Sequence, residues 1–293
     1  MLTAIQQLFS SPPPKTVVML DLDGTLEILE KTLRRATSLH HIPNEKDYQN
    51  LENGFSSSTS EHRLLYKANM QLPEGPYPCY IPHAAFIYLV LLKIAADPNC
   101  IWCIITNSNY NQWSVINFLT EFMQKFTALV RRPDSRYYLP TDYTQDTINF
   151  ISCCALQVIA HLFDSNKFSF YNNGNQPGKD PHKTTRLFDE LDKHNKPNIS
   201  IKLICVEDQV QVLKAIQAEI KKRTDLNFNK QILLLAVHML KPEHIDKVRR
   251  STNYKDLYLP ENEMFAKLIN SLSSLPCSSI LRQAMLARGG CPF

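Results

Sequence analysis

Two aspartates, one residue apart, follow a short apolar run near the start of the chain. The stretch from Val17 to Leu26 reads VVMLDLDGTL. Side chains alternate along a strand, so Asp21 and Asp23 are expected on the same side at its carboxyl end, where open α/β folds bind ligands. Gly24 lets the chain turn away without a Cβ beside that site. A turn or a helix cap explains one aspartate but not two at this spacing, so the pair predicts a ligand-binding or catalytic site.

The same stretch resembles the start of the haloacid dehalogenase (HAD) superfamily, whose phosphohydrolase members open with a hydrophobic strand followed by DxDGT. The second motif of that family is a strand ending in Ser or Thr, and Ile101–Ile105 is followed here by Thr106-Asn107-Ser108. The resemblance implies that Thr106, Asn107 and nearby backbone N–H groups hold the phosphoryl oxygens. Taken alone, Thr106 would be expected only to cap the end of a strand.

The fourth motif of the family is a strand ending in acidic residues that bind magnesium, and residues 201–208 read IKLICVED. Asp208 aligns best with the metal-binding carboxylate, and Glu207 is a second candidate ligand. The alternative role for Asp208 is an N-cap on the helix that follows. The third motif needs a lysine near the start of the preceding helix. Lys179 is favoured because Pro181 suits the first helical turn and leaves this lysine on the loop, and Lys183 is the other candidate.

In HAD phosphohydrolases the first aspartate attacks phosphorus to form an aspartyl-phosphate, and the second acts as general acid and then as general base. The resemblance implies these roles for Asp21 and Asp23, with Mg²⁺ bound by Asp21, Asp23 and Asp208 and a phosphomonoester as substrate. The dehalogenase branch lacks the second acid and is disfavoured. Two alternatives stay open: a phosphotransferase or phosphomutase with the same intermediate, and a catalytically weak HAD-like protein that binds a partner.

Short apolar runs alternate along the chain with longer segments of helical period, which is typical of α/β folds. Together with the resemblance to the HAD superfamily, this alternation implies a Rossmann-like HAD core with a parallel sheet and helices on both faces. The expected strands are residues 16–20, 101–105, 168–171, 201–206 and 232–237, and the expected helices are residues 83–95, 111–126, 181–193 and 209–222.

Three segments do not fit this alternation and divide the chain. The expected core comprises residues 12–30 and 81–238, interrupted by a cap insertion at 31–80 that is polar and turn-rich with one short helix near His62 to Met70. Residues 127–167 include an apolar helix that either packs on the sheet or forms a second insertion. Residues 239–293 are expected to form a helical C-terminal extension. A cap that begins directly after the first motif favours a small phosphorylated substrate over a phosphoprotein.

Composition excludes several other classes of protein. The 293 residues are 44% hydrophobic and 20% charged, so disorder and coiled coil are excluded, and a net charge of +4 does not predict nucleic-acid binding. The longest apolar stretch is too short to span a membrane. Cys100 and Cys103 have CxxC spacing without a second pair, so zinc is not expected. Four of the eight cysteines lie in apolar segments, which favours a reducing compartment and a cytoplasmic location.

Overall fold

The computed structural model describes residues 15–29, 66–81, 84–130, 155–172, 181–195, 199–223, 226, 228 and 232–236. These residues include all five expected strands of the core and its four expected helices. The expected C-terminal extension at 239–293 lies outside the described residues, as does most of the expected cap.

A parallel sheet of five strands forms the centre of the molecule, in the order β6-β5-β1-β7-β8. The strands are β1 (Lys15–Leu20), β5 (Cys100–Thr106), β6 (Phe168–Asn172), β7 (Ile201–Glu207) and β8 (Ile232–Ala236). Every pairing in this sheet is parallel, and β1 lies in the middle between β5 and β7. β1, β5 and β7 are almost continuously buried, which explains their unbroken apolar sequences.

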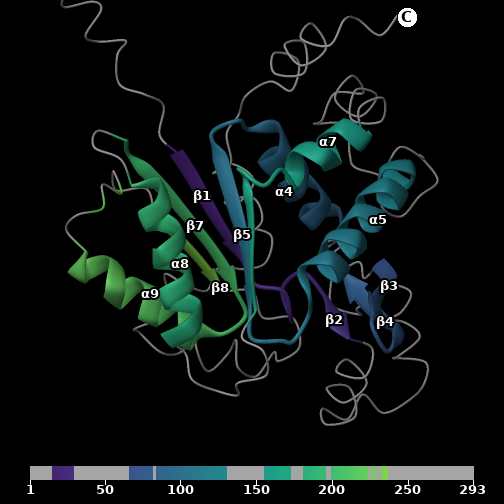
Figure 1. Ribbon diagram of the computed structural model, residues 1–293, viewed down its shortest axis with the longest axis horizontal. Coiled ribbons are helices and arrows are strands. Elements are labelled where there is room, and N and C mark those ends of the chain that lie inside the picture. Colours follow the sequence, from purple (N-terminus) through teal and green to yellow (C-terminus); the bar gives the residue numbers. More distant parts are fainter. Residues whose placement is uncertain are drawn as a thin grey trace, which may run out of the picture.

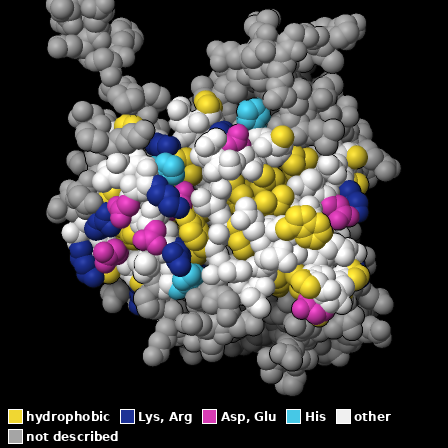
Figure 2. Space-filling model, viewed as in Figure 1, with side chains coloured by type: hydrophobic (Ala, Val, Ile, Leu, Met, Phe, Trp, Pro, Cys, Tyr) yellow, Lys and Arg dark blue, Asp and Glu magenta, His cyan; other side chains and the backbone are white. Residues whose placement is uncertain are grey.

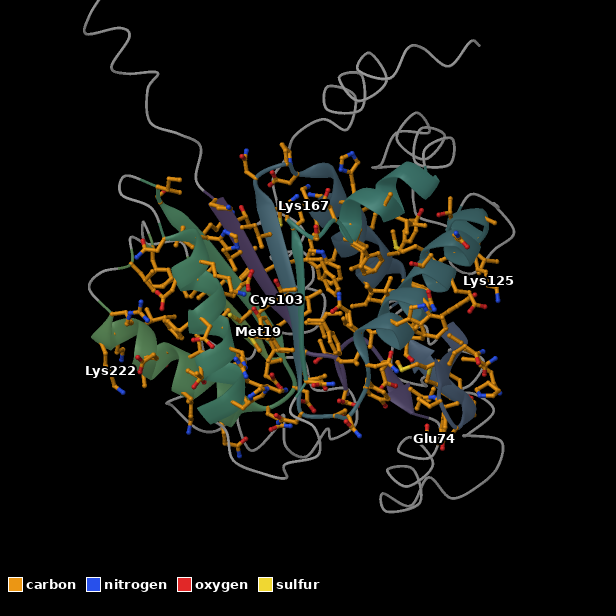
Figure 3. The ribbon with its side chains drawn as sticks, viewed as in Figure 1. Met19, Glu74, Cys103, Lys125, Lys167 and Lys222 are labelled. Atoms are coloured by element: carbon orange, nitrogen blue, oxygen red, sulfur yellow. The ribbon has the colours of Figure 1, made fainter. Side chains whose placement is uncertain are left out.

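Helices cover both faces of the sheet, which confirms the predicted α/β fold class. In Figure 1, α8 (Pro181–His194) and α9 (Val210–Lys222) lie on one side of the sheet, whereas α4 (Ala84–Ala96), α5 (Gln112–Val130) and α7 (Ala155–Leu162) lie on the other. Alternate residues of the strands feed two separate apolar clusters. Val18 and Trp102 belong to the cluster beneath α4, α5 and α7, while Met19 and Cys103 belong to the cluster beneath α8 and α9. Figure 3 labels Met19 and Cys103 near the middle of the sheet.

The strand alternation also separates the two cysteines of the CxxC pair. Cys100 is buried in the first cluster and Cys103 in the second, on opposite faces of the sheet. Residues three apart on a strand point in opposite directions, so these two thiols cannot bind one ion together. Both are free thiols within the core.

A second, antiparallel sheet is formed by β2 (Ile28–Leu29), β3 (Tyr66–Leu72) and β4 (Gly75–Ile81), in the order β2-β4-β3. The predicted short helix near His62 to Met70 is therefore wrong for residues 66–70, which belong to β3. Exposed side chains of β3 alternate with half-buried ones and with buried Met70, as expected for a strand with one face toward the core. β4 crosses the expected boundary between residues 80 and 81, and Cys79 and Ile81 are packed into the main core cluster.

Residues 155–163, in the segment left open between packing and insertion, pack on the core. The side chains of Ile159 and Leu162 belong to the same apolar cluster as Trp102 of β5. The Trp102 indole N–H donates a hydrogen bond to the Leu162 carbonyl at 2.7 Å, which fixes the end of α7 over the sheet. Residues 131–154 lie outside the described part of the chain.

Charged side chains on α8 and α9 alternate in sign. Figure 2 shows Lys and Arg interspersed with Asp and Glu over these helices. Arg223 pairs with Asp192, and Lys193 with Glu190. This face is therefore not a uniformly basic surface. Among the described residues, no helix combines the length and the apolar character needed to cross a bilayer.

Candidate active site

The chemistry-bearing residues gather where β1, β5 and β7 end, at the lower edge of the sheet in Figure 1. Leu20, the last residue of β1, pairs with Ile104 of β5 and Val206 of β7. Asp21 follows at once, and its backbone N–H donates to the Val206 carbonyl at 2.9 Å. Because the three strands are parallel and in register, Thr106 and Glu207 end their own strands at the same edge.

The chain turns sharply after Asp21. The Leu22 carbonyl accepts the backbone N–H groups of Leu26 and Glu27, each at 2.9 Å, and the Gly24 N–H donates to the Glu27 carbonyl at 2.7 Å. Gly24 has φ +80°, a left-handed conformation in which a side chain is strained. A Cβ on Gly24 would lie 2.8 Å from Oδ2 of Asp208. The absent side chain thus lets the turn after β1 approach the acidic end of β7.

We expect Gly24→Ala to weaken both the fold of this turn and any cation binding beside it. The left-handed backbone costs an L-residue about 1–2 kcal/mol, and the added methyl group would displace the Asp208 carboxylate. Thermal unfolding, with and without Mg²⁺, measures both effects. Stabilisation by Mg²⁺ should be smaller in the variant than in the wild type. An unchanged Mg²⁺ effect would show that Asp208 does not take part in binding.

A buried lysine joins two of the carboxylates. The Lys183 ammonium lies 2.7 Å from Oδ1 of Asp21 and 3.0 and 2.8 Å from the two oxygens of Glu207. Lys183 and Asp21 are each only 1% exposed, and Glu207 is fully buried. Lys183 is the third residue of α8, so the amino end of this helix delivers it to the edge of the sheet. A lysine this deeply buried needs charged partners, and two carboxylates supply them.

Burial and charge oppose one another in this cluster. Burial raises the pKa of Asp21 to about 7 against the attraction of Lys183, and Asp208 and Asp23 raise it further. Burial also raises the pKa of Glu207 well above its usual value, and the negative charge of Asp21 adds to this. Burial alone would lower the pKa of Lys183, but Asp21 and Glu207 outweigh it and keep the lysine charged. A further positive charge would favour the ionised carboxylates.

Asp23 has a different environment from Asp21. Its Oδ2 accepts a hydrogen bond from the Thr106 hydroxyl at 2.7 Å and another, short one from the Ser108 hydroxyl. The backbone N–H of Ser108 in turn donates to the Thr106 oxygen at 3.1 Å. Asp23 is also less buried than Asp21. The two predicted catalytic aspartates therefore differ in their hydrogen-bond partners. The Lys183 ammonium binds Asp21, and two hydroxyl groups donate to Asp23.

Three carboxylates meet at a distance that suits one metal ion. Asp21, Glu207 and Asp208 each offer an oxygen, and these oxygens all lie within 4.8 Å of one another. Oδ1 of Asp208 is buried and has no hydrogen-bond partner among the described residues. The N-cap residue of α9 is Gln209 and no side chain caps this helix, so the alternative of a capping role for Asp208 is wrong. Clustered carboxylate oxygens, one of them unpartnered, fit a hard cation such as Mg²⁺.

The structure brings together most of the residues predicted from the sequence. Asp23, predicted as a metal ligand with Asp21 and Asp208, is not in the group of carboxylates that could share one ion, whereas Glu207 is. Asn107 lies in the bend after β5 and is half-buried. Lys183 contacts Asp21, whereas Lys179, the favoured lysine, lies outside the described residues. The sequence analysis assigned no role to Ser108, although Ser108 lies only two residues after Thr106 in the second motif.

Glu27 and Tyr110 were also not predicted to belong to this region. Glu27 is fully buried and accepts a hydrogen bond from the Tyr110 hydroxyl at 3.3 Å. Burial raises the pKa of Glu27 well above its usual value, and the charge of nearby Asp23 raises it further. No sequence signal marks this carboxyl, because a glutamate after Thr25-Leu26 is ordinarily expected at a surface.

Two solved structures share a low level of similarity with this chain. No family model and no curated protein match the chain. A structure of fission yeast RNA polymerase II CTD phosphatase Fcp1 bound to beryllium fluoride is 13% identical, with a TM-score of 0.31, covering 98% of this chain and 58% of that one. A predicted HAD-like family hydrolase from Porphyromonas gingivalis is 13% identical, with a TM-score of 0.30, covering 82% of this chain and 100% of that one. The chain thus spans less than two thirds of the Fcp1 chain, and neither likeness is close enough to inform the site.

Proposed function

We propose that this chain is a Mg²⁺-dependent phosphohydrolase that cleaves phosphomonoesters through an aspartyl-phosphate on Asp21. The observation that supports it best is the unequal pairing of two neighbouring carboxylates, Asp21 with the Lys183 ammonium and Asp23 with two hydroxyls. Hydrolysis through a covalent intermediate needs one carboxylate that stays ionised and another that carries a proton. The Lys183 ammonium suits Asp21 to the first task, and the two hydroxyl donors orient Asp23 for proton transfer.

Asp21 is the proposed nucleophile. Lys183 binds its Oδ1, which leaves Oδ2 to attack phosphorus. A new bond then forms between Oδ2 and phosphorus as the ester P–O bond breaks. Lys183 stabilises the ionised carboxylate before attack and the phosphoryl charge during it. Burial removes competing water from the nucleophile, which strengthens these interactions.

Asp23 is the proposed general acid and base. In the first step its proton passes to the oxygen of the leaving alcohol. In the second step the same carboxylate takes a proton from water as the water oxygen attacks phosphorus and the aspartyl P–O bond breaks. Phosphate leaves, and both aspartates return to their starting states. General acid–base catalysis of this kind typically contributes a factor of about 10² to 10⁴.

Asp21, Glu207 and Asp208 would hold the metal ion. When bound, Mg²⁺ supplies positive charge that offsets the repulsion between a carboxylate nucleophile and a phosphate. Glu207 also binds Lys183 through both oxygens. It therefore fixes the lysine against β7 while Asp208 keeps an unpartnered oxygen.

Hydrolysis of an activated aryl phosphate with Mg²⁺, with excess chelator and with the Asp208→Asn variant tests this function. We expect turnover that needs Mg²⁺, and a Mg²⁺ concentration for half activation at least about 10-fold higher in the variant. Asp189→Asn is the matched control, because Asp189 is an exposed aspartate on α8 with a surface ion pair of little energetic weight. Turnover that persists in chelator, or absence of turnover, would refute the proposal. Product phosphate attached to an added alcohol would instead identify a phosphotransferase.

We further propose that the natural substrate is a small phosphorylated molecule. The support is the position of the insertion in the sequence, since it follows β2, which itself comes directly after the turn at Asp23. Replacing residues 31–64 by a Gly-Ser linker tests this while sparing β3 and β4. Activity on a phosphopeptide should rise relative to activity on an aryl phosphate. An equal change in both activities would show that the insertion does not select substrates by size.

A further inference from the structure

The Thr106 hydroxyl has two tasks and one proton. Its O–H donates to Oδ2 of Asp23 at 2.7 Å, and its oxygen already accepts the Ser108 N–H at 3.1 Å. A threonine hydroxyl can donate only one hydrogen bond at a time. Thr106 therefore cannot donate to a phosphoryl oxygen, as the sequence predicts, and hold Asp23 at the same moment.

Ser108 supplies a second donor to the same oxygen. Its hydroxyl donates a short hydrogen bond to Oδ2 of Asp23, so this carboxylate has two donors on one oxygen and keeps Oδ1 clear of them. Ser108 reaches Asp23 from the bend after β5, only two residues beyond Thr106. If the Thr106 hydroxyl turns to donate its hydrogen bond to the substrate, the hydrogen bond from Ser108 to Asp23 remains.

We propose that Ser108 is a positioning residue that keeps the Asp23 carboxyl in its catalytic orientation while Thr106 donates to the substrate phosphoryl group. Thr106 then donates to the phosphoryl group while Ser108 holds Asp23, because one hydroxyl cannot donate to both at once. Neither hydroxyl donates to Oδ1, so we assign Oδ1 as the oxygen that serves the leaving group. This role rests on the proposed function, because it acts through Asp23 as acid and base.

Steady-state kinetics with two esters tests the catalytic part. Departure of an alkyl alkoxide needs the proton from Asp23 more than departure of an activated aryl oxide does. Ser108→Ala should therefore lower kcat for an alkyl phosphate at least about 10-fold more than for an aryl phosphate, and Ser108→Thr should restore most of the loss. In an Asp23→Ala background, Ser108→Ala should cost nothing further. Ser114→Ala is the control, since Ser114 is a buried serine whose hydroxyl has no partner among the described residues.

Equal losses for the two esters, or a further loss in the Asp23→Ala background, would show that Ser108 acts on the phosphate directly and would overturn the proposal. If the wild type hydrolyses neither ester, the proposed function fails, and the catalytic role of Ser108 fails with it.

Ligand-free crystal structures test the positioning part without any activity. In Thr106→Val, Ser108 alone should hold the Asp23 carboxylate in its wild-type rotamer, and the carboxylate should move only in the Thr106→Val, Ser108→Ala double variant. Movement of Asp23 in Thr106→Val alone would show that Ser108 is insufficient and would overturn this part of the proposal.

Discussion

Asp21→Asn is expected to lower the rate of phosphate release by a factor on the order of 10⁴ or more, while the fold stays intact. The amide is nearly the same size as the carboxylate but cannot form the aspartyl-phosphate. Folding should not suffer, because Asp21 is a carboxylate buried at a cost, and the Lys183 ammonium keeps Glu207 as its charged partner. Mg²⁺-dependent turnover of an aryl phosphate measures the activity, and thermal unfolding measures the stability.

Asp189→Asn, at an exposed position, is again the control for the loss of one carboxylate. Its turnover should match that of the wild type. Normal turnover in Asp21→Asn would exclude Asp21 as the nucleophile. An unfolded Asp21→Asn protein would contradict the stability argument and would call for Asp21→Ser as a second variant.

Lys183→Met is expected to lower turnover by about 10² to 10³, the range found when one charge-stabilising donor is removed. Asp21 and Glu207 would then face each other without a cation, and breaking a buried ion pair on one side costs about 3–5 kcal/mol. The single variant should therefore be less stable when Mg²⁺ is absent. Adding Glu207→Gln removes one of the two unpaired charges, so the double variant should recover part of the lost stability without recovering activity.

Lys179→Met decides between the two lysines of the sequence prediction. We expect it to keep most of the wild-type turnover, because Lys183 already contacts Asp21. Loss of activity in Lys179→Met together with retention in Lys183→Met would reverse the assignment. Activity and unfolding are measured on the same preparations, so that a catalytic loss is separated from a folding loss.

The strands and helices of the core could be predicted because local pattern and tertiary environment agree there. The β5 sequence is apolar up to its last residue, Thr106, and the strand is buried throughout. Residues 66–70 show the opposite outcome. Lys67, Asn69 and Gln71 alternate with buried or half-buried residues, which is the period of a strand. This period is hard to recognise in the sequence because the segment is short and polar. The prolines of β4 also disguised a strand, and they are tolerated there because β2 pairs only with Cys79 and Tyr80.

The site could be predicted as far as the topology determines it. Parallel strands that end together bring Asp21, Thr106 and Asp208 to one edge without any further information. The lysine depended on a finer signal. Lys183 lies four residues before Leu187 on the buried stripe of α8, and a lysine on such a stripe must be buried and paired. The hydrogen bond from Ser108 to Asp23 depends on side-chain rotamers, which sequence spacing does not specify.

Trapping the phosphoenzyme tests the proposed mechanism most directly. Asp23→Asn keeps the nucleophile but removes the base for hydrolysis, so the intermediate should accumulate. The variant is mixed with Mg²⁺ and an activated aryl phosphate, quenched in acid, digested and examined by mass spectrometry. The proposed mechanism predicts one phosphoryl group on the peptide that contains Asp21, which is absent when Asp21→Asn is added or Mg²⁺ is removed. Phosphate on another residue, or hydrolysis by the wild type with no phosphoryl group on Asp21 under these conditions, would contradict it.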